Sequence, residues 1–91
     1  MAKTETIQKP ETVQNVLTQY TITNANWGLI DLGIATNEYV VVGAFTPFES
    51  NISVRLSNIE RGNWRAQLVD ALTNGTVTSG SHYIMLFYVN R

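Results

Sequence analysis

Few residues of this chain could carry out covalent chemistry. The single histidine, His82, follows Ser81, and a Ser-His pair is part of many hydrolase sites. A serine nucleophile also needs an orienting acid and an oxyanion site, and the chain has no G-x-S-x-G sequence to present its hydroxyl. One histidine, scattered carboxylates and no cysteine match no metal-ligand spacing. We therefore expect no enzyme activity, with no catalytic residue, no metal and no cofactor.

Two tryptophans have the polar neighbours that saccharide sites use. The apolar C–H face of a sugar ring stacks on an aromatic ring, while amide and guanidinium groups bind its hydroxyls. Trp27 lies in a turn-like segment, and Trp64 lies at the mouth of a hairpin. The candidate ligand-binding residues are Trp27, Asn24, Asn26, Trp64, Asn63 and Arg65. Either tryptophan could instead fill the core or a subunit interface.

Three arginines gather around the same hairpin. Arg55, Arg61 and Arg65 could bind an anionic glycan, or they could pair with Glu49 and Glu60. Exposed ion pairs of the second kind contribute little to stability. We favour the pairing interpretation.

The elements that must position these residues are strands. Val, Ile, Thr and the aromatic residues make up 36 of the 91 residues, and these types fit a pleated, half-buried surface. Alternation of apolar and polar residues, together with turn residues, predicts strands over 16–23, 29–35, 39–45, 52–57, 64–69 and 81–90. The segments 52–57 and 64–69 form a hairpin in this prediction. The sequence thus predicts an all-β fold, a small antiparallel sandwich or jelly-roll-like domain.

Three details of these strands are also predicted. Gly33 interrupts the strand 29–35, which indicates a β-bulge or a close approach of another backbone segment. The segment 39–45 is apolar on both faces, and we expect it to be a central strand. Asn74-Gly75 tolerates positive φ at both central positions of a tight turn, while the flanking Thr73 and residues 76–81 weaken the hairpin signal and leave the register open.

The last strand is apolar on both faces. His82, Ile84, Leu86 and Tyr88 alternate with a second set of large apolar residues, namely Tyr83, Met85, Phe87 and Val89. A domain of this size has one core to cover one face, so the other face needs a second sheet or a second subunit. We expect this strand to be central, and we favour a subunit contact through Tyr83, Met85, Phe87 and Val89.

Length and charge exclude several classes of protein. Ninety-one residues suffice for one domain, which we place at 16–91, with residues 1–15 as an extended arm or linker or simply a disordered end. A net charge of -1 without a Lys/Arg run argues against nucleic-acid binding. The apolar stretches are far shorter than the roughly 20 residues of a spanning helix, so we expect no membrane insertion. Residues 1–15 lack the apolar centre of a secretory signal.

From about Glu38 to its end, the chain resembles the C-terminal receptor-binding head or tip domains of bacteriophage tail-fibre and minor structural proteins. The resemblance rests on the order of five segments and on their residue types, namely YVVVGAF, NISVRLSNIERGN, WRAQLVD, TNGTVTSGS and YIMLFYV. It covers about 54 of the 91 residues. It implies a homotrimer at the end of a fibre that binds a host cell-surface saccharide and contacts other virion proteins. It also implies a place in the virion, tail or fibre, after a soluble stage in the host cytoplasm.

Two other functions remain open at this stage. The chain could be a structural virion protein, a capsid decoration or fibre cap with no ligand of its own. It could also be a monomeric carbohydrate-binding module. Exposed tryptophans favour saccharide binding, whereas buried tryptophans favour assembly.

Overall fold

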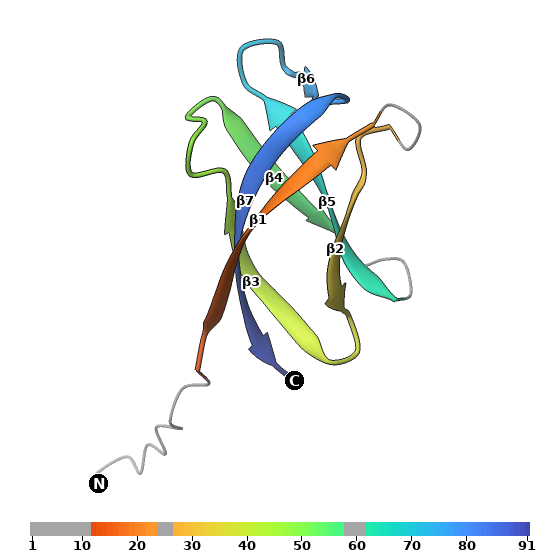
Figure 1. Ribbon diagram of the computed structural model, residues 1–91, viewed down its shortest axis with the longest axis vertical. Coiled ribbons are helices and arrows are strands. Elements are labelled where there is room, and N and C mark those ends of the chain that lie inside the picture. Colours follow the sequence, from red (N-terminus) through yellow and green to blue (C-terminus); the bar gives the residue numbers. More distant parts are fainter. Residues whose placement is uncertain (1–11, 24–26, 58–61) are drawn as a thin grey trace, which may run out of the picture.

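A computed structural model describes residues 12–23, 27–57 and 62–91 (Figure 1). The strands of this part are β1 (Gln14–Ile22), β2 (Ile30–Ala35), β3 (Tyr39–Phe45), β4 (Ile52–Ser57), β5 (Asn63–Asp70), β6 (Gly75–Thr76) and β7 (Gly80–Asn90). Sheet A has the order β1-β7-β3, and sheet B has the order β2-β5-β4 with the short β6 paired to β5. All pairs are antiparallel, and the sheets pack face to face. The predicted all-β antiparallel sandwich is confirmed.

The core lies between the two sheets because successive side chains of a strand point to opposite faces. Ile84 and Leu86 of β7 meet Ala66 and Leu68 of β5, and all four are fully buried. The side chain of Tyr20 on β1 also crosses to sheet B, where its hydroxyl donates a hydrogen bond to the carbonyl oxygen of Leu32 over 3.1 Å. Within the described residues, no helix has the length and hydropathy of a membrane span.

Strand β7 is the central strand of sheet A, as the sequence predicted. It pairs with the whole of β1, from Gln14 opposite Tyr88 to Ile22 opposite Gly80. Its second half pairs with β3. Strand β1 begins two residues before the predicted start at residue 16. Residues 1–11 of the predicted arm lie outside the described residues.

The prediction that segment 39–45 is a central strand was wrong. This segment is β3, at the edge of sheet A, and it pairs only with β7. Val41 and Ala44 face the core, whereas Phe45 is 46% exposed on the outer side. The strand is apolar on both faces because one face meets the core and the other joins an exposed apolar surface. Apolar faces alone do not show whether both backbone edges are paired.

The hairpin and the bulge were predicted correctly. Strands β4 and β5 pair in continuous register from Ile52 opposite Asp70 to Ser57 opposite Arg65. In β2 the register against β5 shifts between Asp31 and Ala35, and Gly33 within this shift has φ of +73°. A left-handed conformation of this kind carries no penalty for glycine, which lacks a Cβ.

The turn around Asn74 differs from its prediction. Asn74 has φ of 57°, but Gly75 has no positive φ because it already belongs to β6, opposite Asp70. Residues 71–74 therefore form a four-residue turn, which the Asn74 amide closes by donating to the carbonyl oxygen of Asp70 over 2.7 Å.

The carboxylate of Asp70 holds this turn to the neighbouring loop. Its Oδ1 accepts hydrogen bonds from the Asn51 side chain over 3.0 Å and from the Leu72 amide over 2.9 Å. These two bonds, the Asn51 bond first, lower the pKa of Asp70 below its ordinary value. They favour the ionised form, so the carboxylate stabilises the fold above the unfolded-state pKa of about 3.9. This contribution is lost as the pH falls through the lower, folded-state pKa.

We expect Asp70→Asn to weaken the acid dependence of stability. The amide keeps one acceptor oxygen but does not titrate, so the variant should lose less of its free energy of unfolding between pH 5 and pH 2 than the wild type. Urea denaturation at a series of pH values measures this difference. If the free energy of unfolding fell by the same amount between pH 5 and pH 2 in both proteins, the role assigned to Asp70 would be contradicted.

Candidate functional site

Trp64 is not available as a sugar-stacking platform. Its side chain is only 8% exposed, and its indole Nε1 donates to the carbonyl oxygen of Tyr39 over 3.1 Å. The prediction of Trp64 as a ligand-binding residue was wrong. Trp64 shares the inward face of β5 with Ala66 and Leu68, which are both fully buried. The strict alternation of this strand was the signal that placed it in the core.

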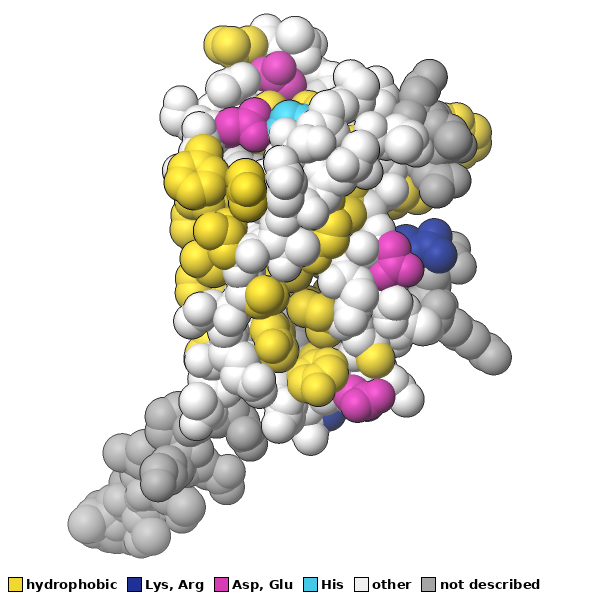
Figure 2. Space-filling model, viewed as in Figure 1, with side chains coloured by type: hydrophobic (Ala, Val, Ile, Leu, Met, Phe, Trp, Pro, Cys, Tyr) yellow, Lys and Arg dark blue, Asp and Glu magenta, His cyan; other side chains and the backbone are white. Residues whose placement is uncertain are grey.

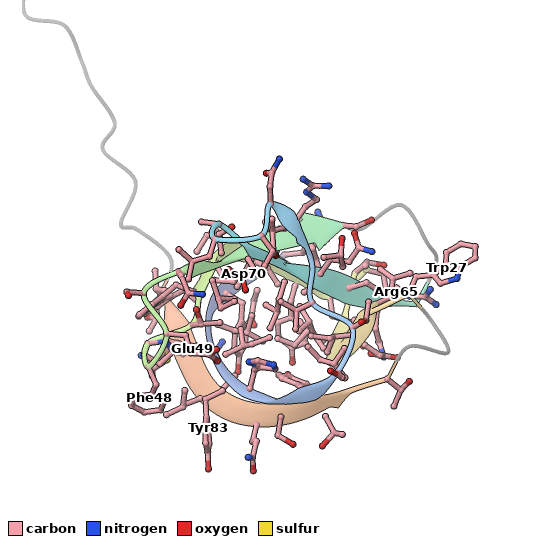
Figure 3. All side chains as sticks on the ribbon, turned by 90° about the horizontal axis from the view of Figure 1, so that it is seen from above. Trp27, Phe48, Glu49, Arg65, Asp70 and Tyr83 are labelled. Atoms are coloured by element: carbon pink, nitrogen blue, oxygen red, sulfur yellow. The ribbon has the colours of Figure 1, made fainter. Side chains whose placement is uncertain are left out.

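Trp27 is the exposed tryptophan of the described residues. It is 78% exposed, with φ of 56°, and the next residue, Gly28, has φ of 80°. The carbonyl oxygen of Trp27 accepts a hydrogen bond from the Gln67 side chain over 3.2 Å, which ties the turn to β5. In Figure 3 the Trp27 ring points away from the domain. The backbone of this turn is thus anchored while the ring is presented to solvent.

The other predicted ligand-binding residues fall into two groups. Asn24 and Asn26 lie outside the described residues. Asn63 and Arg65 alternate with the buried side chains of β5 and so lie on the outer face of sheet B. Figure 3 shows Arg65 on the same side of the domain as Trp27.

The outer face of sheet B is polar, and we call it the polar face. Its polar side chains are Asp31, Ser53, Arg55, Ser57, Asn63, Arg65 and Gln67, and the apolar Val69 lies opposite Ser53 on the same face. Asp31 accepts hydrogen bonds from the Gly33 amide over 2.8 Å and from the Asn63 side chain over 3.0 Å. The Asn63 side chain is thus partly engaged, while its amide oxygen makes no hydrogen bond to a described residue.

The two arginines of the polar face are available for a ligand within the described part of the chain. Arg55 lies opposite Gln67, and Arg65 lies between Asp31 and Ser57 in the strand register. Neither guanidinium makes an ion pair with a described carboxylate. The expected pairing with Glu49 does not occur, because Glu49 lies against His82 instead. Glu60 and Arg61 lie outside the described residues.

His82 joins the last strand to the loop between β3 and β4. Its Nδ1 lies 2.6 Å from Oε1 of Glu49, and its Nε2 lies 3.2 Å from the carbonyl oxygen of Ser79. The hydroxyl of Ser81 lies 3.2 Å from that of Thr21 and does not contact the imidazole. No ring nitrogen is therefore directed at a nucleophile. This His82–Glu49 contact, which we call the clasp, joins two residues that are 33 positions apart in the sequence. No sequence pattern indicates it.

A metal site is not formed by the described residues. No three His, Cys, Asp or Glu side chains gather within 12–23, 27–57 and 62–91. A polar hollow near the end of the chain is lined by Asn37, Glu38, Tyr39, Asn90 and Arg91. The Arg91 guanidinium there already donates to the carbonyl oxygen of Thr36 over 2.6 Å.

The four residues predicted for a subunit contact all lie on the outer face of sheet A. Tyr83, Met85, Phe87 and Val89 alternate with the buried Ile84 and Leu86. Neighbouring rings extend the surface. Phe45 stacks on Phe87 with ring centroids 6.1 Å apart, and Phe48 meets Tyr83 edge-on at 5.5 Å. Figure 2 shows hydrophobic side chains gathered on this side of the domain, below the histidine.

Comparison with known proteins gives no relative. The chain matches no family model, no curated protein and no solved structure.

Proposed function

We propose that this chain is a non-enzymatic adhesion domain that binds a host cell-surface saccharide through Trp27 and the polar face. In this proposal it forms the head of a bacteriophage fibre in the virion. It acts there as a homotrimer attached to other virion proteins. The phage assignment and the number of subunits rest on the resemblance of residues 38–91 to fibre-tip domains.

The observation that carries the saccharide proposal is the exposure of Trp27 beside a polar surface. A large apolar ring is 78% exposed at a turn whose backbone is fixed by Gln67. Sugar rings stack on such a surface, and their hydroxyls need donors and acceptors close by. Gln67 and Arg65, two residues apart on β5, supply amide and guanidinium groups on that side. A shallow site of this kind binds weakly, and several copies on one fibre raise the overall affinity.

We expect Trp27→Ala to weaken saccharide binding at least about fivefold, because loss of ring stacking costs about 1 kcal/mol or more. A glycan array of bacterial surface polysaccharides identifies the ligand, and titration calorimetry with the best glycan gives the affinity. Leu72→Ala is the matched control, since Leu72 is 83% exposed on a different turn. Equal binding by wild type and Trp27→Ala would contradict the proposal.

A structural virion protein without a ligand is the second candidate function. The uncharged apolar outer face of sheet A favours it, because such a surface suits assembly. In that case the wild type would form an oligomer but bind no glycan on the array.

A further inference from the structure

Charge is divided unevenly between the two sheets. The strands β1, β3 and β7 contain no Asp, Glu, Lys or Arg. Their single histidine, His82, shares the inward face of β7 with the buried Ile84 and Leu86. Sheet B, by contrast, carries Asp31 and Arg65 on its outer face. The outer face of sheet A is therefore uncharged along its strands.

This uncharged face is also apolar and open to solvent. Leu17 of β1 lies opposite Met85 of β7, which lies opposite Phe45 of β3, so large apolar side chains form a row across all three strands. Leu17 is 42% exposed, Phe45 46% and Tyr83 42%. Asn15, Gln19 and Thr21 of β1 share this face and are polar, so the apolar surface lies over β7, β3 and Leu17. A large exposed apolar patch of this kind marks an interaction site.

The loop of residues 46–51 extends the same surface beyond the end of β3. Strand β3 ends opposite Met85, and the loop continues beside the remaining part of β7. Two contacts hold it there. The Glu49 carboxylate binds His82 on the inner side of β7, and the Phe48 ring packs against Tyr83 on the outer side. Figure 3 shows Phe48 and Tyr83 at the same corner of the domain. Phe48, 69% exposed, is thus held as a strongly exposed apolar group beside Tyr83.

We propose that the outer face of sheet A packs against the same face of neighbouring copies of this chain around a shared symmetry axis. A charged partner surface would lose its hydration against a face that offers no opposite charge. Among the described residues, the other sheet face carries Arg55, Arg65 and Asp31, so it does not match. The surface that matches an uncharged apolar face is that face itself, related by a symmetry axis.

This inference deepens the proposed function, since it names the contact that joins the saccharide sites of several copies. Self-association does not itself depend on a saccharide. Saccharide binding and self-association can therefore fail separately, whereas a monomeric chain would also contradict the homotrimer of the proposed function.

The test measures the solution mass of the full chain by light scattering after size exclusion, over a series of protein concentrations. We expect the wild type to be an oligomer, and we expect Tyr83→Glu and Leu17→Glu to raise its dissociation constant at least about 100-fold, because each buries an unpaired charge in the contact. Ser53→Glu is the matched control, because it adds the same charge to an exposed position of the polar face and should keep the wild-type mass. Circular dichroism tests whether each variant is folded. We expect both glutamate variants to fold, because Leu17 and Tyr83 are exposed to solvent.

Cross-linking gives a second readout. The chain has no cysteine, so Tyr83→Cys and Ser53→Cys each introduce a single thiol. A short bis-maleimide should join copies through position 83 but not through position 53.

A wild type that is monomeric at every concentration would overturn the proposal, as would an oligomer that both glutamate variants leave intact. A dimer or a trimer that Tyr83→Glu dissociates would support it. Monomeric Tyr83→Glu should still bind the array-selected glycan as a monovalent fragment with wild-type affinity. A chain that assembles through this face but binds no glycan would refute the saccharide proposal alone.

Discussion

Replacement of Gly28 by alanine is expected to lower the free energy of unfolding by about 3 kcal/mol. Gly28 has φ of +80°, where a side chain strains the backbone by about 1–2 kcal/mol. An added Cβ would also lie 2.4 Å from the carbonyl oxygen of Val77, which belongs to the backbone and cannot rotate away. The turn that carries Trp27 would have to move. Urea denaturation measures the loss of stability.

Gly33→Ala is the matched control for this prediction. Gly33 has nearly the same φ, +73°, but an added Cβ would meet no atom within 4 Å. Only the backbone strain remains, so we expect a loss of about 1–2 kcal/mol. Equal losses for the two variants would show that close approach to Val77 does not matter. In the folded Gly28→Ala protein, weaker glycan binding would further connect this turn with the proposed site.

The second large effect is expected for Leu86→Ala, which should cost about 3 to 5 kcal/mol. Leu86 is fully buried in the middle of β7, opposite Val16 on one side and Ala44 on the other. Shortening it leaves a cavity between two sheets that are fixed by their hydrogen-bonded ladders. Thermal and urea unfolding give the stability.

Leu17→Ala makes the same chemical change on the outer face of the same sheet. Because Leu17 is 42% exposed, we expect a loss below about 1 kcal/mol in the monomer. The two variants must be compared at protein concentrations where the chain is monomeric, since assembly adds its own free energy to the apparent stability. If Leu17→Ala were as damaging as Leu86→Ala in the monomer, the assignment of inner and outer faces would be wrong.

Much of the fold could be predicted from the order of apolar, polar and turn residues along the sequence. The alternation in 52–57 and 64–69 predicts the β4–β5 hairpin, and Gly33 predicts the bulge in β2. These features are local, because side-chain period and glycine conformation depend on neighbours in the chain. The same reasoning divides β7 into its two faces, one with Ile84 and Leu86 and one with Tyr83.

The candidate site was less predictable. Trp27 and Trp64 have similar polar neighbours in sequence, yet one is exposed and the other lies in the core. The clasp between Glu49 and His82 joins residues that no sequence pattern connects. Both results depend on how the sheets pack, which is a contact between distant segments.

The sequence by itself therefore determined the six longer strands, the inner and outer residues of β4, β5 and β7, and the bulge in β2, since these follow from local periodicity and backbone preference. The tertiary structure alone decided that β3 is an edge strand and that Trp64 is buried while Trp27 is not. It also decided that every charged residue of the described strands belongs to sheet B. The physical reason is that strand order and sheet packing are set by contacts between residues far apart in the chain, which local patterns do not specify.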